Sequence, residues 1–91
     1  MKRAVVTVLG TDRVGIIAGV TSTLSSFEIN VLDITQTIMQ DSVFVMSALV
    51  DLERCNATFH EVKERLNELG ESLGVSIRIQ REEVFLSLIH I

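Results

Sequence analysis

The order of apolar patterns along the chain predicts an α+β protein of the ferredoxin-like class, with a β-α-β-β-α-β arrangement. Three observations predict it: a β-branched run near the N-terminus, two segments with helical spacing of apolar residues, and alternating runs after each helix. Right-handed crossovers then place both helices on one face of a four-stranded antiparallel sheet. The 91 residues fit a single domain, residues 1–91.

The first strand and helix are predicted from residues 3–9 and from the segment between Asp12 and Phe27. Residues 3–9 are β-branched and apolar on both faces, which is typical of a central strand. Asp12 is the expected N-cap of the helix, which runs to about Phe27. Its expected buried stripe follows spacings of 3, 4 and 3 residues: Ile17, Val20, Leu24 and Phe27. The remaining face is rich in Ser, Thr and Gly, so packing must hold this helix in place.

Residues 31–40 and 42–51 predict two strands joined by a tight turn near Gln40-Asp41-Ser42. The first strand alternates between a mostly apolar and a mostly polar face, as a half-exposed strand requires. The second is apolar on both faces apart from Ser47. We therefore expect the second strand to be covered on both faces.

The second helix has clear start and stop signals. Thr58 and Glu61 form a capping-box pattern, and Gly74 is a typical C-terminal stop. Its apolar residues follow spacings of 3, 4, 3 and 4: Phe59, Val62, Leu66, Leu69 and Leu73. A final strand alternates Val75, Ile77 and Ile79 with polar residues.

The C-terminal tail, residues 84–91, is unusually apolar, because six of its eight residues are large and apolar. Such a tail is expected to form a short helix that packs on the sheet or on a second subunit. Packing of the tail on the sheet of its own chain, without a second subunit, is the alternative to a dimer. The sheet face and the tail together exceed what a chain of this size hides alone, which favours a homodimer.

Composition excludes several classes of function. The net charge of −4 gives no attraction for nucleic acid or for an anionic membrane surface. Cys55 is the single cysteine, so the chain contains no disulfide framework and no thiolate metal cluster. No apolar run is long enough to span a membrane, and Met1-Lys2-Arg3 leads into a strand rather than a signal peptide. We expect a cytoplasmic protein without cofactor or metal.

The loop between the first strand and the first helix is the main candidate site. Its residues are Gly10, Thr11, Asp12, Arg13, Val14, Gly15 and Ile16. The helix that follows directs free backbone N–H groups into this loop, which suits a small anionic or zwitterionic molecule. Asp12 is available for an amino group and Arg13 for a carboxylate. In the alternative interpretation, Gly10 makes a turn, Asp12 caps the helix and Gly15 allows helix and sheet to pack closely.

Two amides are further candidates. Asn30 lies where the first helix meets the second strand, and we expect it near the Gly10–Gly15 loop. Its alternative role is to tolerate a left-handed turn conformation. Gln36 interrupts an apolar strand face, so it is either a ligand contact or a hydrogen-bonded core amide, and it ranks below Asn30.

The pattern Gly10-x-Asp12-x-x-Gly15-Ile16, followed by a helix and Ile29-Asn30-Val31, resembles the ACT domain. The resemblance covers nearly the whole chain. It is closest to single-domain ACT proteins and to the ACT halves of proteins like the glycine cleavage repressor. It implies a regulatory, ligand-binding or protein-associating role, with Asn30 at a position that commonly contributes to ligand contact. The family usually has a glycine shortly before this asparagine, whereas here the stretch is Phe27-Glu28-Ile29.

The leading hypothesis is therefore a non-catalytic homodimer that senses an amino acid or similar metabolite, or acts through a regulated protein partner. A pure assembly module without a small ligand is the alternative. An acylphosphatase-like enzyme would use Arg13 to hold a phosphate and Asn30 to orient a water, but the phosphate loop of that family is not matched. RNA binding on the open sheet face needs exposed aromatic residues, and the central strands offer only Phe44.

Overall fold

A computed structural model describes residues 2–11, 15–40 and 42–89. In chain order the elements are β1 (Arg3–Thr11), α1 (Ile16–Ser26), β2 (Asn30–Met39), β3 (Val43–Asp51), α2 (Phe59–Leu73), β4 (Ser76–Arg81) and α3 (Glu82–Ile89). The predicted β-α-β-β-α-β order is confirmed, and the C-terminal helix α3 is added to it.

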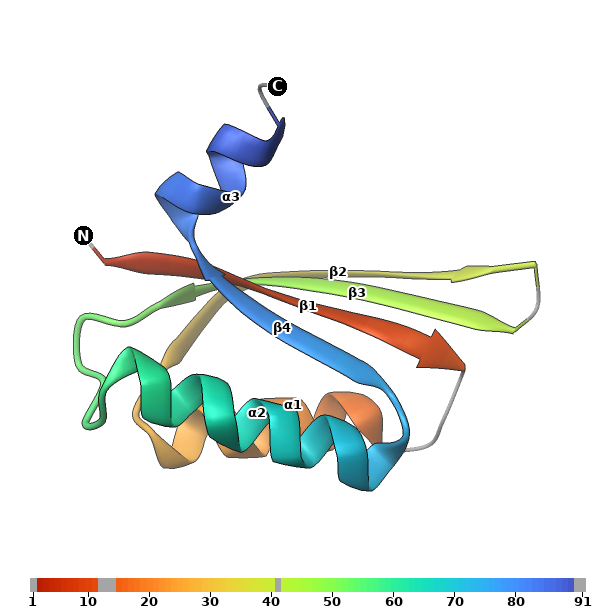
Figure 1. Ribbon diagram of the computed structural model, residues 1–91, viewed down its shortest axis with the longest axis horizontal. Helices are drawn as coiled ribbons and strands as arrows, with labels where there is room; N and C mark the ends of the chain where they lie inside the picture. Colours follow the sequence, from red (N-terminus) through yellow and green to blue (C-terminus); the bar gives the residue numbers. More distant parts are fainter. Residues whose placement is uncertain (1, 12–14, 41, 90–91) are drawn as a thin grey trace.

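The four strands form one antiparallel sheet in the order β2-β3-β1-β4. Helices α1 and α2 lie side by side on one face of this sheet, which we call the helix face (Figure 1). Helix α3 rises from the other side, which we call the open face. The strand β1 pairs with β3 and β4, so its predicted central position is confirmed, and it extends two residues beyond the predicted end.

The core lies between the helix face and the two covering helices. Alternate residues of β1 and β3 point into it: Ala4, Val6, Val8, Phe44, Met46, Ala48 and Val50 are all buried. From the helices, Val20, Leu24, Val62 and Leu66 complete the packing. This alternation follows from the two-residue period of a strand and the 3.6-residue period of a helix.

The strand β3 is not covered on both faces of a single chain, which corrects the prediction from its composition. Val45 and Leu49 on the open face are only half-buried, and Val43 is 38% exposed. A single chain therefore leaves apolar side chains of β3 uncovered on the open face.

Helix α1 begins at Ile16 with Gly15 as its N-cap, so the prediction of Asp12 as the N-cap is wrong. Gly15 adopts a left-handed conformation with φ of +91°, which glycine reaches without a steric penalty. The buried stripe therefore uses Ile16 in place of Ile17, which is half-buried. The helix ends at Ser26.

Glu28 ends the turn after α1 in a left-handed conformation with φ of +59°. The Glu28 N–H donates to the Ser25 carbonyl at 2.9 Å, and the Ile29 N–H donates to the Leu24 carbonyl at 3.0 Å. These bonds satisfy carbonyl groups at the end of the helix. The glycine expected before Asn30 is thus replaced by a glutamate that takes the conformation glycine favours.

Helix α2 matches its prediction at both ends. The Glu61 N–H donates to Thr58 Oγ1 at 3.1 Å, and the Thr58 N–H donates to Glu61 Oε1 at 3.0 Å, so the capping box is complete. Gly74 closes the helix in the left-handed conformation, with φ of 73°.

The tail forms the predicted short helix as far as Ile89, but α3 has no buried residue. A bidentate contact holds its start: Arg3 Nη2 lies 2.7 Å from Glu82 Oε2, and Arg3 Nε donates to Glu82 Oε1 at 3.1 Å. Beyond this anchor Val84, Leu86, Leu88 and Ile89 are exposed in the single chain, whereas Phe85 is half-buried.

Candidate functional site

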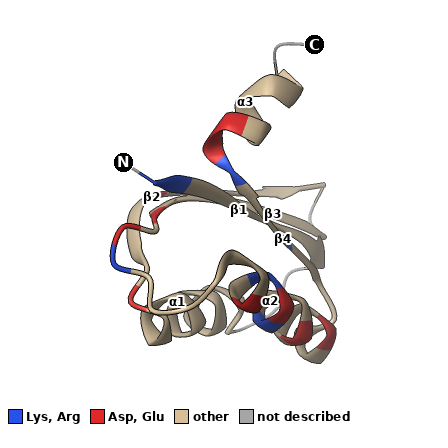
Figure 2. Ribbon diagram, turned by 60° about the vertical axis from the view of Figure 1, so that its left-hand side comes forward, with Lys and Arg blue, Asp and Glu red and all other residues tan. Residues whose placement is uncertain are grey.

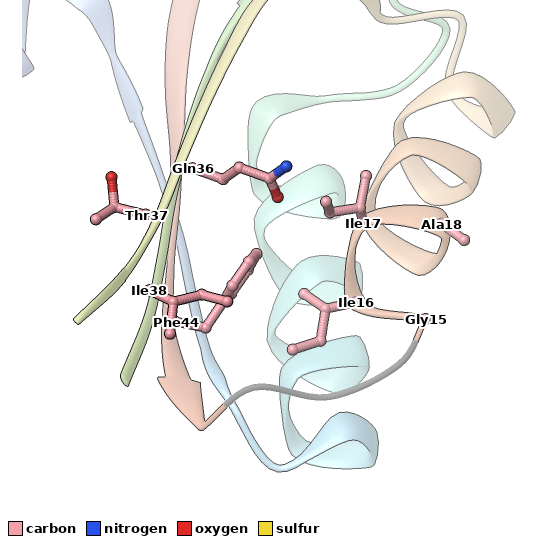
Figure 3. A pocket seen from close by; sticks show the side chains of 8 residues that line it. All are labelled: Gly15, Ile16, Ile17, Ala18, Gln36, Thr37, Ile38 and Phe44. Carbon is pink, nitrogen blue, oxygen red and sulfur yellow. The ribbon is translucent and has the colours of Figure 1, made fainter. Parts of the chain in front are cut away.

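A cavity of about 480 Å³ opens between the first turn of α1 and the end of the β2–β3 hairpin. Its size lies within the range of small-ligand sites, roughly 300–1,000 Å³. Eight of the described residues line it: Gly15, Ile16, Ile17, Ala18, Gln36, Thr37, Ile38 and Phe44 (Figure 3). Three of these, Gly15, Ile16 and Gln36, were predicted as candidates.

The first turn of α1 contributes backbone donors to this cavity. The first hydrogen bond within the helix runs from the Gly19 N–H to the Gly15 carbonyl at 2.8 Å. The N–H groups of Ile16, Ile17 and Ala18 therefore have no partner within the helix. Gly15 offers no side chain to cap this terminus, and its first turn carries no acidic residue. The partial positive charge of the helix N-terminus is thus available to an anion.

The Gln36 side chain provides the polar group opposite this helix terminus. Gln36 pairs with Met46 of β3, whose side chain is buried, so both point to the helix face. Figure 3 shows its amide directed toward α1, beside Ile17. The side chain is exposed, and within the described parts of the chain its amide makes no hydrogen bond. The prediction of a hydrogen-bonded core amide is therefore wrong.

The remaining wall of the cavity is apolar. Ile16 and Phe44 are buried at its base, and Ile38 is 54% exposed at its rim. Figure 3 shows Ile38 and Phe44 side by side, facing Ile16, whereas Thr37 points to the other side of the sheet. None of the eight lining residues carries a charge. The cavity thus combines backbone donors and one amide with an aliphatic and aromatic wall.

Gly10 has a packing role that its sequence context did not reveal. It lies within β1, opposite Phe44, and not in a turn, so its predicted role as a turn residue is wrong. A Cβ at this position would lie 2.5 Å from Val75 Cγ1 and 3.2 Å from Val75 Cα. The absence of a side chain at Gly10 therefore lets β1 pack closely against Val75 of the same chain. Thr11 is exposed at the end of β1, opposite Val43.

Asp12, Arg13 and Val14 lie outside the described residues. Their predicted roles toward an amino group and a carboxylate stay predictions. Gly15 and Ile16, which follow them, lie directly at the cavity.

Asn30 lies at the opposite end of the sheet from Gly15, so the predicted proximity to the loop is wrong within one chain. It pairs with Asp51, which in turn pairs with Arg3 at the start of β1. The physical reason is the length of α1, whose 11 residues carry the chain about 16 Å along the sheet before β2 begins. Asn30 instead borders a separate hollow lined by Glu28, Asn30, Asp51, Glu53 and Arg54.

Other titratable and metal-binding groups do not gather into a site. Over the described ranges, no three His, Cys, Asp or Glu side chains lie close enough to hold a metal ion. Cys55 is half-buried, and its thiol donates to the Ala57 carbonyl at 3.4 Å. Among residues 2–11, 15–40 and 42–89, no helix has the length and apolarity needed to cross a membrane. Phe44 points into the core, so it is not available on the open face for stacking with a base.

Comparison with known proteins finds one family along almost the whole chain. The sequence model of the ACT domain matches residues 2–80. A UPF0237 protein of Clostridium acetobutylicum is 52% identical over 86 residues, which cover 94% of this chain and 96% of that protein.

Solved structures agree with this match. An ACT domain protein from Streptococcus pneumoniae has a TM-score of 0.80 and is 32% identical, covering 92% of this chain and 93% of that one. A structure described as a proposed glycine cleavage system transcriptional repressor has a TM-score of 0.72 at 22% identity, covering 88% of this chain and 45% of that one. This last likeness shows a shared fold.

Proposed function

Because the chain belongs to the ACT-domain family, whose members are generally regulatory ligand-binding modules, we propose that it is a non-catalytic amino-acid sensor that acts as a homodimer. The observation that carries the proposal is the N-terminus of α1, to which Gly15 offers no side-chain cap, facing the Gln36 amide, which has no hydrogen-bond partner among the described residues, across one apolar-walled cavity. The proposal includes a cytoplasmic location, where free amino acids are present as potential ligands.

The polar groups of the cavity suit the two ends of an amino acid. The N–H groups of Ile16, Ile17 and Ala18 can donate to a carboxylate, which the helix N-terminus also favours electrostatically. The Gln36 carbonyl oxygen can accept from the ammonium group, because a glutamine side chain offers both an acceptor and donors. Asp12 and Arg13 flank this position in the sequence and are proposed to complete the polar shell.

The apolar wall supports a preference for an aliphatic side chain. Ile16, Ile38 and Phe44 supply hydrocarbon and aromatic surface, and none of the described residues that line the cavity is charged. A charged ligand side chain placed against this apolar wall would lose hydration without gaining a partner there. We therefore expect valine, leucine, isoleucine or methionine to bind more tightly than aspartate, glutamate or lysine.

The edge strand β2 supports a dimer that includes this site. It has ten residues, is paired on one side only, and contains neither Pro nor Lys nor Arg. Long unprotected edges of this kind readily pair with another strand. Gly19 of α1 lies against Leu69 and Leu73 of α2, so the opposite side of α1, with Ile17 and Thr21, flanks the β2 edge. That side of α1 is uncharged, which suits contact with a second copy.

Pairing of β2 with β2 of a second copy would bring Asn30 to the end of the sheet where the partner's cavity lies. The two strands would run antiparallel about a two-fold axis near Thr35, as isologous dimers require. Asn30 of one chain would then lie at the same end of the joined sheet as Gly15 and Ile38 of the other. In this arrangement the partner supplies the amide that a single chain places too far away.

The test is binding of the twenty amino acids, measured by thermal shift and by calorimetry on the purified full chain. Gln36→Met removes the amide while keeping the length of the side chain. It is expected to weaken binding about tenfold, equivalent to one hydrogen bond of about 1.4 kcal/mol. Gln80→Met is the matched control, because Gln80 lies on the edge strand β4 and pairs with Val5, away from the cavity. Asn30→Ala should weaken binding similarly if the partner's amide takes part.

The alternative of a pure assembly module is favoured by one observation, the exposed apolar surface of α3. If no amino acid raises the melting temperature of the chain, the sensing proposal fails and the assembly module remains. If binding occurs and Gln36→Met and Gln80→Met weaken it equally, the ligand lies elsewhere on the molecule.

A further inference from the structure

We infer that two copies of this chain pack open face to open face, with α3 of each copy seated on an apolar patch at the far end of the other copy's sheet. This contact uses side chains of the open face, whereas the β2 edge contact uses the backbone of β2 and the ligand cavity lies on the helix face. It does not depend on the proposed sensing function. Four observations support it: the apolar surface of α3, an apolar patch at the other end of the sheet, the distance between the two within one chain, and the charge and area of the exposed surface.

Helix α3 is apolar around most of its circumference. Its large exposed side chains are Val84, Leu86, Leu88 and Ile89, each between 46% and 60% exposed. Phe85 is half-buried. The polar residues of α3 are Glu82 and Glu83 in its first turn and Ser87 further along. A short helix with this composition is normally buried on more than one side. It carries Glu82 and Glu83 and no basic residue in Glu82–Ile89, which disfavours an anionic membrane as its partner.

The open face has a second exposed apolar cluster at its other end, which we call the distal patch: Leu9, Met39, Val43 and Val45. Leu9 pairs with Val45, and Met39 pairs with Val43, so the four side chains are neighbours on one face. Leu9 is 54% exposed and Met39 is 52% exposed. Contiguous apolar surface of this kind marks an interaction site.

The chain cannot cover the distal patch with its own α3. Arg81, the last residue of β4, pairs with Ala4, whereas Leu9 pairs with Ser76 at the start of that strand. The helix therefore starts about 17 Å from the patch, at 3.4 Å per strand residue. Arg3 fixes the start of α3 through Glu82, and the helix rises away from the sheet (Figure 1).

If a two-fold axis relates two copies through their open faces, α3 of one copy no longer has to reach the distal patch of its own chain. A helix with its side chains is about 10–12 Å across, and α3 rises from the open face on the side where the second sheet would lie, so it can fill the space between the ends of two facing sheets. With strands antiparallel across the axis, the α3 end of each chain meets the distal patch of the other. The contact is self-complementary, because each chain contributes one helix and one patch.

Charge and area agree with this arrangement. Arg78 pairs with Thr7 near the middle of the open face, and both are polar, so the apolar contacts lie at the two ends. Residues 84–89 of α3 and the four residues of the distal patch are all uncharged, so their contact buries no charge. A compact 10.1 kDa monomer is expected to expose about 5,300 Å², and this chain exposes 5916 Å². The excess of about 600 Å² approaches the roughly 800 Å² that each partner contributes to a stable interface.

Sedimentation equilibrium of the full chain at micromolar concentration tests the assembly. The double variant Leu86→Ser/Leu88→Ser should halve the mass of the assembly, whether the wild type contains this contact alone or also the β2 edge contact. Asn67→Ser is the control, because Asn67 is exposed on α2, on the helix side of the sheet, away from α3, the distal patch and the β2 edge. Monomeric wild type, or an unchanged mass for the α3 variant, would overturn the inference.

Cross-linking identifies the contact itself and does not depend on stability. In a Cys55→Ser background, Leu9→Cys combined with Leu88→Cys or Leu86→Cys should give covalent dimers on mild oxidation. The pair Leu32→Cys/Leu88→Cys is the control, with the same number of thiols and no expected contact. Equal yields from the two pairs would contradict open-face packing even if the chain is a dimer through β2.

Discussion

The two helices that cover the sheet begin in opposite ways. At the start of α2, Thr58 and Glu61 satisfy each other's backbone donors, and an acidic residue lies in the first turn. At the start of α1, Gly15 provides no side chain, and no acidic residue follows. Charge separates the two helices as well, since α2 carries both signs along its surface and α1 carries none (Figure 2).

This difference separates a terminus whose backbone donors are satisfied by a capping box from one whose N-cap residue has no side chain to offer. The donors at α2 are satisfied within the chain, so they have nothing to offer a ligand. The donors at α1 open into a cavity beside Gln36, where a carboxylate could satisfy them. A protein that keeps one helix terminus uncapped next to a cavity loses some stability that ligand binding can restore.

The largest effect is expected at Gly10, which holds the strand leading to α1. Gly10→Ala places a methyl group 2.5 Å from Val75 Cγ1, and we expect it to lower the free energy of unfolding by about 1–3 kcal/mol. Gly15→Ala meets no atom of the described residues within 4 Å, so its expected cost is conformational, about 1–2 kcal/mol for a left-handed alanine. Urea denaturation of both variants measures the two values.

Two further variants distinguish the steric cost at Gly10 from the conformational cost at Gly15. Val75→Ala should reduce the cost of Gly10→Ala in a double-mutant cycle and leave the cost of Gly15→Ala unchanged. Gly15→Asn should be milder than Gly15→Ala, because asparagine tolerates the left-handed region. A cost at Gly10 that does not depend on Val75 would contradict the packing explanation.

The capped terminus of α2 gives the next largest effect. Thr58→Ala removes the oxygen that accepts from the Glu61 N–H, and it is expected to cost about 1 kcal/mol, within the usual range of 0.5–2 kcal/mol for such caps. Thr58→Ser retains the hydroxyl and should remain close to wild type. If Thr58→Ala and Thr58→Ser are equally stable in chemical denaturation, the capping box contributes nothing to α2.

The same contrast shows what could be read from the sequence. Helix α2 was predictable in full, because its start at Thr58 and its stop at Gly74 are local signals. The start of α1 was predicted too early, at Asp12, because aspartate is a common N-cap and a left-handed glycine cap gives no comparable signal. The order of strands and helices was predictable because each pattern has its own period.

The candidate site was only partly predictable, because it depends on contacts between distant residues. Gln36 and Gly15 meet through the pairing of β2 with β3, and Gly10 is constrained by Val75, 65 positions along the chain. The position of Asn30, in contrast, follows from the sequence, because a helix that connects two strands carries the chain from one end of the sheet to the other. The direction in which α3 leaves the sheet depends on the Arg3–Glu82 contact, which no sequence pattern indicates.

A smaller effect of opposite sign is expected when α1 receives the acidic residue that α2 already has. Ala18→Glu places a carboxylate in the first turn of α1, at an exposed position that borders the cavity. It should stabilise the ligand-free chain by about 0.3–1 kcal/mol through the helix dipole. The same carboxylate should repel the carboxylate of an amino acid, so the thermal shift caused by ligand should disappear.

Ser22→Glu is the matched control for this substitution. Ser22 is exposed on the same helix but lies beyond the first turn, where the dipole contributes little. We expect it to change neither stability nor the ligand response appreciably. If Ala18→Glu leaves the ligand response intact, the ligand does not use the α1 terminus.

The smallest effect concerns the pH dependence of the capping box. Hydrogen bonds from the Thr58 backbone and side chain, together with the positive field of His60, lower the pKa of the exposed Glu61 carboxyl below its ordinary value of 4.5. A lowered folded-state pKa means that this contribution to stability is present above pH 4.5 and is lost as the pH falls through the lower folded-state value. Glu61→Gln keeps a hydrogen-bonding side chain at this position but removes the titrating group. Melting temperatures of the wild type and Glu61→Gln, measured from pH 6 to pH 3, should therefore converge on the acidic side, with the wild type falling more steeply. Parallel curves over that range would show that the Glu61 carboxylate adds no pH-dependent stability to α2, and the two helix termini would then differ in hydrogen bonding alone.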